Sequence, residues 1–202
     1  MDRHRLNVTR ISEALGTPSG RSSDFDLNPG ARPAPGARLR AASVLVPLVE
    51  RGSGLSLILT RRAALLKHHP GQVAFPGGKQ DPGDASPLAA ALREAEEEIG
   101  LAPGAVEVLG ALDPHETVTG FTVAPFVGLV APGFRPAIDP AEVAEVFEVP
   151  AAFAFDPANF QVQGRVWQGR ERRYYVLPWG PHYIWGATAR ILRALADRMQ
   201  AP

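Results

Sequence analysis

Cysteine is absent from this sequence of 202 residues. Its absence excludes disulfides, thiolate metal sites, cysteine nucleophiles and iron–sulfur clusters, so any metal ion must be held by oxygen or imidazole. Net charge is lacking as well, because 21 lysines and arginines balance 21 aspartates and glutamates. We therefore expect neither a general nucleic-acid binder nor a protein that binds membranes through a polybasic surface.

Long hydrophobic runs are also missing. The longest strongly apolar stretch, residues 41–49, is interrupted by Ser43 and Pro47, whereas a membrane-spanning helix needs about 18 or more apolar residues. The first residues, Met1 to Arg5, are not followed by the apolar core of a secretory signal. We therefore expect a cytoplasmic protein.

The length suggests one domain with a short extension, since about 150 residues per domain is the usual prior. Residues 1–40 are interpreted as an N-terminal arm, in which residues 6–15 could form a helix and residues 16–40 are rich in glycine, proline, serine and arginine. This composition is typical of a poorly ordered arm, and a part in a lid or a dimer contact is the alternative. Residues 41–202 are expected to form the domain itself.

The rest of the chain mixes strand and helix patterns, which predicts an α/β fold. Residues 141–149 carry signals of both kinds. Alternation and turn residues predict an antiparallel pair, further strands, a hairpin around Gly169 and a C-terminal helix. The antiparallel pair is expected at residues 42–48 and 55–59, and the further strands at residues 73–75, 106–112 and 121–130. The hairpin is expected at residues 161–167 and 174–179, and the helix at residues 184–199.

Residues 86–99 carry the clearest helix signal. Ser86 suits the N-cap, Pro87 the first helical position and Gly100 the position just past the end. Apolar residues at helical spacing fall within about 100° of arc and predict one buried stripe. Its members are Leu88, Ala91, Leu92, Ala95 and Ile99.

Three carboxylates, those of Glu94, Glu97 and Glu98, share another face of this helix. They repel one another and lie in the last turns, where the helix dipole disfavours negative charge. A bound cation would explain the arrangement, and a hard divalent ion such as Mg²⁺ prefers oxygen ligands. The alternative is a solvated acidic face, because glutamate is a good helix former.

The segment before the helix points to the same chemistry. The adjacent Gly77 and Gly78 permit tight turns and close backbone approach, and Asp81 and Asp84 follow in the loop. A strand, a glycine turn, an acidic loop and a carboxylate-bearing helix together make a platform for phosphate and metal. An ordinary turn is the alternative for the two glycines alone.

Residues 78–101 resemble the Nudix box. That pattern is glycine, five residues, glutamate, seven residues and then Arg-Glu-apolar-x-Glu-Glu-x-Gly-apolar. Residues 93–101 match its second half in full. The first half departs from it in two ways, because Asp84 stands where glutamate is expected and one extra residue follows.

An upstream motif is similar to one found in the coenzyme A diphosphatase branch of the Nudix hydrolases. Residues 58–63 (Ile-Leu-Thr-Arg-Arg-Ala), Lys67, Gly71 and residues 75–78 (Phe-Pro-Gly-Gly) follow the branch pattern. Isoleucine replaces the usual leucine, and lysine replaces an arginine. The resemblance extends over residues 41–195.

This resemblance implies the Nudix fold, a mixed β-sheet sandwiched between α-helices. It also implies a diphosphatase that uses Mg²⁺ or Mn²⁺ and hydrolyses coenzyme A or its derivatives to 3′,5′-ADP and 4′-phosphopantetheine or its acyl form. The alternative substrates are ADP-ribose, a dinucleotide or a nucleoside triphosphate. A non-catalytic binding module with the same fold is a further alternative.

The resemblance also suggests roles for the residues of the box. Glu94 and Glu98 are expected to be the firmest metal ligands, with Glu97 also coordinating, and Arg93 is expected to support the carboxylates. Gly78 is expected to contribute a backbone group near the metal.

The general base is left open by the sequence. It could be a box glutamate not fully used by the metal, Glu97 or Glu98, or it could be Glu145 from a separate segment. Glu142 is a weaker rival. Both Glu142 and Glu145 could instead be surface carboxylates.

Substrate contacts are expected from Arg62, Lys67, Gly77 and Gly78. Positive charge concentrates at Arg61, Arg62, Lys67, His68 and His69, which favours a phosphate contact over a solvated loop. The histidines are expected in polar or loop roles and not as metal ligands. Arg165, Arg170, Arg172 and Arg173 are expected on the hairpin surface, and Trp179 and Trp185 in the core.

Overall fold

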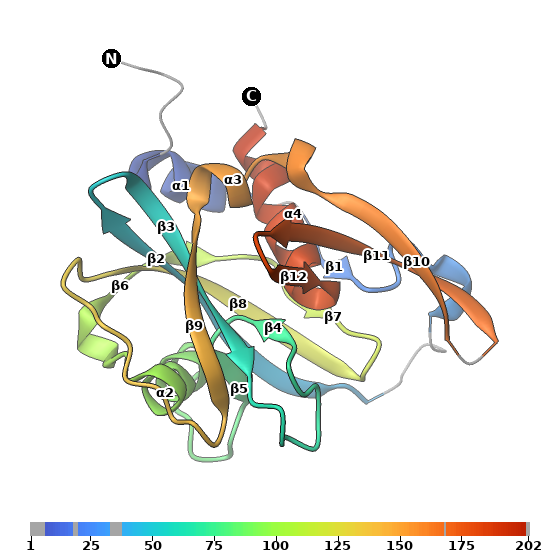
Figure 1. The fold of residues 1–202 in the computed structure, drawn as a ribbon, viewed down its shortest axis with the longest axis horizontal. Helices are drawn as coiled ribbons and strands as arrows, with labels where there is room; N and C mark the ends of the chain where they lie inside the picture. Colours follow the sequence, from blue (N-terminus) through green and yellow to red (C-terminus); the bar gives the residue numbers. More distant parts are fainter. Residues whose placement is uncertain (1–6, 18–19, 33–37, 168, 201–202) are drawn as a thin grey trace.

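A computed structural model describes the chain in four stretches, residues 7–17, 20–32, 38–167 and 169–200. Figure 1 shows a mixed β-sheet in the middle of the molecule with helices on both of its sides. This arrangement confirms the fold expected from the sequence.

Four long strands form the body of the sheet. β2 (Arg40–Arg51) and β3 (Gly54–Arg62) are antiparallel, which confirms the pair expected around residues 51–54. β8 (Phe121–Val130) runs parallel to β2 along most of its length, and β9 (Val143–Pro150) is antiparallel to β3. The ambiguous segment at residues 141–149 is thus mainly a strand.

Shorter strands complete the sheet. One of them matters for the site, because β5 (Gly77–Lys79) pairs with the first half of β2 and fixes the glycine turn against it. The others are β1 (Ser22–Ser23), β4 (Val73–Ala74), β6 (Val106–Ala111) and β7 (His115–Glu116).

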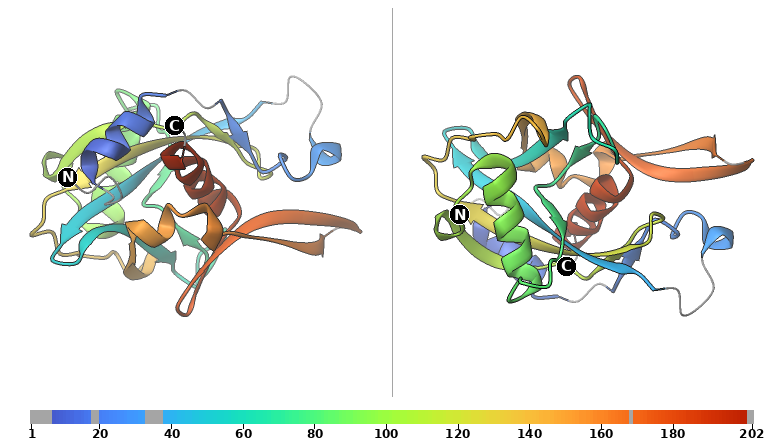
Figure 2. Two further views of the ribbon diagram at one scale, coloured as in Figure 1. Left: turned by 90° about the horizontal axis from the view of Figure 1, so that it is seen from above. Right: turned by 90° about the horizontal axis from the view of Figure 1, so that it is seen from below.

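Both faces of the sheet are buried beneath helices, and successive residues of a strand point to opposite faces. Leu57 and Leu59 of β3 pack into the core beneath α1 (Val8–Leu15) and α4 (Gly186–Gln200), whereas Ile58 packs into the core beneath α2 (Pro87–Ile99). Figure 2 shows the sheet between these two sets of helices. A four-residue helix, α3 (Ala151–Ala154), adds to the α4 side.

Helix α2 (Pro87–Ile99) forms as the sequence predicts. The Ser86 hydroxyl accepts a hydrogen bond from a backbone N–H of the first turn at 3.1 Å. Gly100 ends the helix in the left-handed conformation, with φ 69° and ψ 24°, which glycine adopts without a steric penalty. Members of the predicted stripe that are fully buried against the sheet are Ala91, Ala95 and Ile99.

The described parts of residues 1–40 pack against the domain. Ile11 of α1 is fully buried. Further along, the Ser22 hydroxyl lies 2.9 Å from Nδ1 of His115, and Nε2 of that histidine lies 3.1 Å from Oδ1 of Asp24. The boundary at residue 40 remains a prediction, and residues 1–6, 18–19 and 33–37 of the arm lie outside the described residues.

A second, three-stranded sheet contains the predicted hairpin, β10 (Gln161–Trp167) and β11 (Arg170–Trp179). Its third strand is β12 (His182–Trp185). The sequence predicts that the C-terminal helix begins at residue 184, and this start is wrong because β12 occupies that position. Ile184 and Trp185 pair with β11, so the helix begins only at Gly186.

Short turns of 3-10 helix lie at Pro29–Ala31, Pro103–Ala105 and Pro157–Asn159. Among the helices of the described stretches, none is both long enough and apolar enough to cross a membrane.

Candidate functional site

Three carboxylates converge at one end of α2. Glu94 and Glu98 come from the helix, and Glu142 comes from the loop just before β9. Each contributes an oxygen, and these oxygens all lie within 4.8 Å of one another. The residue at the centre of this carboxylate cluster, Glu98, is only 2% exposed.

Glu142 reaches the cluster because its loop is tied to the end of α2. The backbone N–H of Ala137 donates to the carbonyl of Ile99 at 2.9 Å, and the N–H of Asp139 donates to the carbonyl of Glu98 at 3.1 Å. These carbonyls belong to the last turn of the helix, where no intrahelical partner is available. The Glu142 N–H in turn donates to the carbonyl of Asp139 at 3.1 Å.

The glycine turn forms the wall opposite the helix. The backbone N–H of Gly77 donates to Oε2 of Glu98 at 3.2 Å. The Glu94 carboxylate lies so close to Gly78 that a Cβ on this glycine would be 2.5 Å from it. A side chain at position 78 would therefore displace the Glu94 carboxylate, in keeping with the close backbone approach that the two glycines suggest in the sequence.

Arg62, the last residue of β3, brings positive charge to the cluster. Its NH1 lies 3.6 Å from Oε1 of Glu98. Its Nε is buried and makes no hydrogen bond to any residue that the structure describes. A buried donor without a partner is unfavourable, so an anionic ligand oxygen would be stabilised beside it.

Ionisation of two of the clustered glutamates is unfavourable in this site. Burial raises the pKa of Glu98 to about 8, and the Gly77 N–H and the Arg62 charge offset only part of this effect. Burial also raises the pKa of Glu94 above its usual value. Grouped carboxylate oxygens of this kind suit a hard divalent cation, and the donor set fits Mg²⁺ or Mn²⁺.

Arg93 binds several acidic groups on the outer side of the cluster. Its Nε and NH2 donate to the two oxygens of Asp84 at 2.9 and 3.1 Å, and its NH1 donates to Glu94 at 3.0 Å. The structure thus places Arg93 where it supports a carboxylate of the cluster. Asp84, which occupies a position of the predicted box, is bound to this arginine and lies outside the cluster.

Glu97 does not join the cluster, although the sequence grouped it with the metal ligands. At about 100° per residue, Glu97 lies about 60° to one side of Glu94, and Glu98 lies about 40° to the other side. Only the latter side faces the glycine turn. The Glu97 side chain is 57% exposed and accepts a hydrogen bond from Arg93 at 2.9 Å. Its predicted metal and catalytic roles remain predictions.

Glu145 also lies outside the cluster. Its Oε2 accepts a hydrogen bond from Nε of Arg61 at 2.9 Å, and its Oε1 lies 3.7 Å from Nε2 of His182. That imidazole stacks on the Phe147 ring with centroids 3.6 Å apart. Of the two glutamates that the sequence offered outside the box, the weaker rival, Glu142, is the one that meets the box carboxylates. The role of Glu145 remains a prediction.

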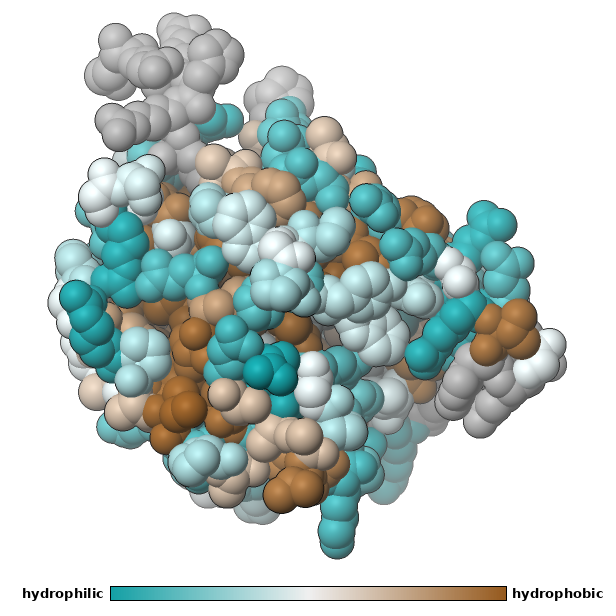
Figure 3. All heavy atoms as spheres, in the orientation of Figure 1, coloured by the Kyte–Doolittle hydropathy of each residue, from teal (hydrophilic) through white to brown (hydrophobic). Residues whose placement is uncertain are grey.

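The basic loop predicted to contact substrate connects β3 to β4. Lys67 is exposed in it, and the neighbouring Leu65 is 97% exposed. Figure 3 shows hydrophilic side chains interspersed with hydrophobic ones on the face of the molecule that β9 crosses. The structure thus places Arg62 and both glycines at the cluster and Lys67 in the adjoining loop.

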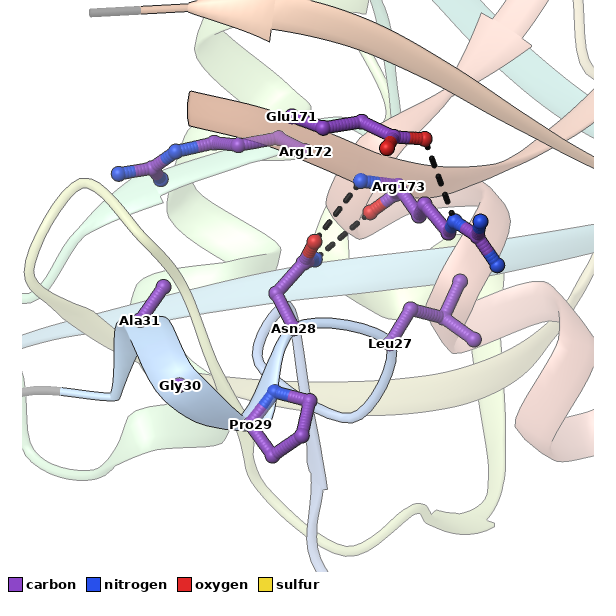
Figure 4. A pocket seen from close by; sticks show the side chains of 8 residues that line it. All are labelled: Leu27, Asn28, Pro29, Gly30, Ala31, Glu171, Arg172 and Arg173. Atoms are coloured by element: carbon purple, nitrogen blue, oxygen red, sulfur yellow. Dashed lines mark hydrogen bonds and ion pairs between the residues drawn. The ribbon is translucent and has the colours of Figure 1, made fainter. Parts of the chain in front are cut away.

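A separate cleft of about 230 Å³ lies between residues 27–31 and β11. The Asn28 side chain bridges it, because its amide exchanges hydrogen bonds of 2.7 and 2.8 Å with the backbone of Arg173 (Figure 4). None of the clustered carboxylates lines this cleft.

Comparisons with known proteins find a family model and relatives that share the same family description. A family model described as the NUDIX domain matches residues 38–174. A curated relative from Enterobacter sp. (strain 638), called an uncharacterized Nudix hydrolase NudL, is 46% identical over 158 residues, which are 78% of this chain and 81% of the relative. Its namesake from Cronobacter sakazakii (strain ATCC BAA-894) is 48% identical with the same coverage. Among solved structures, the Nudix hydrolase RenU from M. smegmatis aligns with a TM-score of 0.48 and 24% identity over 55% of this chain and 71% of its own.

Substitution of Gly78 by alanine tests the close packing at the turn. The new methyl group displaces the Glu94 carboxylate, so we expect the affinity for Mn²⁺ to fall by about 10-fold or more, as for other supporting contacts at metal sites. Gly83→Ala is the matched control, because a Cβ at that position meets nothing within 4 Å. Calorimetric titration measures both, and equal affinities for the two variants would contradict the packing argument.

The raised pKa of Glu98 predicts a pH-dependent stability of the metal-free protein. The folded state binds the Glu98 proton more tightly than the unfolded state, so the free energy of unfolding decreases as the pH rises from about 4.5 to about 8. Glu98→Gln should remove this contribution, whereas Glu96→Gln, at an exposed position, should keep it. Urea unfolding with chelator at several pH values measures it. Parallel pH profiles for wild type and Glu98→Gln would refute the assignment.

Proposed function

This chain belongs to the Nudix hydrolase family. We propose that it hydrolyses the diphosphate bond of coenzyme A and its derivatives. The products would be 3′,5′-ADP and 4′-phosphopantetheine or its acyl form. The reaction class, hydrolysis of a phosphorus-containing anhydride, follows from the family, whose members use divalent metal ions. The substrate is our proposal.

The carboxylate cluster carries the proposal. Glu94, Glu98 and Glu142 come from two separate segments, and their carboxylate oxygens lie close enough together to serve as ligands of Mg²⁺ or Mn²⁺. Such an ion supplies positive charge that neutralises diphosphate oxygens and makes water easier to deprotonate. A binding module without catalysis would have no need to keep these three carboxylates together.

Substrate binding is assigned to the groups that face the cluster. Arg62 would donate its free Nε–H to a diphosphate oxygen, and Lys67 would attract the substrate from the adjoining loop. Gly77 and Gly78 hold the turn closely against β2 and Glu94, and we assign them a backbone contact with the diphosphate. The choice of coenzyme A is supported by the motif at residues 58–78, which resembles the coenzyme A branch.

Glu142 is our candidate for the general base. It reaches the cluster from a loop and not from α2, so it can face the water from a different direction than Glu94 and Glu98. In the proposed step the water oxygen bonds to phosphorus, and the water proton passes to the Glu142 carboxylate oxygen that does not bind the ion. The bridging P–O bond breaks, and its electron pair leaves with the departing phosphate.

A substrate panel with Mg²⁺ or Mn²⁺ tests the substrate. We expect coenzyme A, acyl-coenzyme A or oxidised coenzyme A to be cleaved with the highest kcat/KM, measured by chromatography of 3′,5′-ADP. ADP-ribose, a dinucleotide and a nucleoside triphosphate complete the panel. Cleavage of ADP-ribose with coenzyme A left intact would show that the substrate assignment is wrong while the reaction class stands.

Paired substitutions test the base. Glu142→Gln should lower kcat by about 10² to 10⁴-fold, the usual contribution of a general base. Glu145→Gln, three residues away and bound to Arg61, should stay within about threefold of wild type, as a partly exposed surface pair contributes little. Thermal unfolding verifies that both variants are folded. The opposite ranking of the two variants would transfer the role to Glu145.

A further inference from the structure

The hairpin of β10 and β11 projects from the body of the molecule, and its outer strand has an open edge. Figure 2 shows the hairpin extending past α4 at one end of the molecule. The second sheet has the order β10-β11-β12, so in the described chain no other strand pairs with the outer edge of β10. Every residue from Gln161 to Val166 is exposed to solvent. An edge strand of this kind is a template for pairing with another chain.

The other edge of the hairpin is closed by a side chain. The Arg173 N–H donates to the side-chain oxygen of Asn28 at 2.8 Å, and the Asn28 amide donates to the Arg173 carbonyl at 2.7 Å (Figure 4). Both backbone groups of Arg173 therefore point away from β10, although Arg173 pairs with Gly164 of that strand. In an antiparallel ladder, such pairs alternate with pairs that exchange both hydrogen bonds. Gly164 accordingly directs its own N–H and carbonyl to the open edge.

Val162 and Val166 share the backbone orientation of Gly164, because the pattern repeats every two residues. The open edge thus presents the N–H and carbonyl groups of these three residues. Their side chains lie on one side of the hairpin, where the two valines are 51% and 75% exposed. The strand has no proline and no lysine, two residues with which proteins often protect an exposed edge.

We propose that the partner of this edge is a second copy of the chain, and that two β10 strands pair antiparallel about a two-fold axis through Gly164. Gly164 is the middle residue of a strand of 7 residues, so this register aligns the two strands along their full length. It places Val162 opposite Val166 of the partner copy, and it places the two copies of Gly164 opposite each other. All three outward residues then exchange hydrogen bonds across the interface. Because a two-fold contact is closed, the assembly stops at a dimer.

The charges near the axis are compatible with the pairing of identical strands. Arg165 would face Gln163 of the partner copy, whereas an axis through Arg165 would oppose two like charges. On the valine side, Nε of Arg173 lies 3.4 Å from Oε1 of Glu171. The same oxygen would lie 3.0 Å from a Cβ on Gly164, so each copy brings a balanced pair of charges to the axis. The whole chain has no net charge, so two copies do not repel each other at long range.

The size of the contact predicts a weak dimer. A strand of 7 residues is about 23 Å long. One pair of such strands is smaller than a standard stable interface, which buries about 1,200 Å² or more. We therefore expect a dissociation constant in the micromolar range. The inference goes beyond the proposed function, because none of the clustered carboxylates belongs to the hairpin.

Sedimentation velocity at protein concentrations from about 1 µM to about 1 mM measures the association. The wild-type chain should change from monomer to dimer across this range. Val166→Lys, which places a charge against Val162 of the partner copy, should raise the dissociation constant by about 10-fold or more. Val118→Lys is the matched control, because Val118 is 41% exposed and lies outside the hairpin, and it should dimerise as the wild type does. A wild-type monomer at every concentration, or a dimer that Val166→Lys leaves intact, would overturn the proposal.

Cysteine substitutions test the register, because the chain has no cysteine of its own. A hydrogen-bonded antiparallel pair has Cα atoms about 5.5 Å apart, which suits a disulfide. Gly164→Cys should therefore form a covalent dimer under mild oxidation, measured by non-reducing electrophoresis. Val166→Cys alone should not, because the register separates the two copies of this position by about 14 Å. Its equal mixture with Val162→Cys should form the covalent dimer again.

The cysteine variants decide the question even if Val166→Lys does not fold, and thermal unfolding verifies that each of them does. Formation of the covalent dimer by Val166→Cys alone, as fast as by Gly164→Cys, would show random collision and overturn the proposed pairing. So would the absence of a covalent dimer in both Gly164→Cys and the mixture.

Discussion

Burial of Glu98 beside two other carboxylates is the constraint on which the site depends. Glu98 is buried at the centre of the cluster, and its ionisation is unfavourable there unless positive charge is supplied. Arg62 supplies part of that charge at 3.6 Å, and a divalent cation among the oxygens would supply the rest. A bound divalent ion would therefore stabilise the ionised carboxylates, which are unfavourable in the metal-free protein.

The fold maintains this arrangement through contacts between distant segments. β5 places the glycine turn against β2, and the loop before β9 is bound to the last carbonyls of α2. Arg62 belongs to the end of β3, and the loop that contains His69 closes on the same residue. Four segments of the chain thus meet at one point, and each is positioned by backbone hydrogen bonds, so the geometry does not depend on flexible side chains alone.

Helix α2 could be predicted from the sequence because its signals are local. The cap at Ser86, the stop at Gly100 and the buried stripe all come from residues within one segment. That Glu97 lies outside the cluster could not be predicted, because it shares the acidic face with Glu94 and Glu98, and only the position of the glycine turn separates them. For a similar reason, the sequence alone favours Glu145 over Glu142 as the general base. Its placement depends on a loop that contacts α2 some forty residues away in sequence.

Diffraction from crystals soaked in Mn²⁺ tests the central claim most directly, because the ion is located by its anomalous scattering. The account predicts a peak coordinated by carboxylate oxygens of Glu94, Glu98 and Glu142, beside the backbone of Gly77 and Gly78. A peak bound by Glu97 or Glu145 in place of these residues, or no peak at the cluster at saturating Mn²⁺, would contradict it.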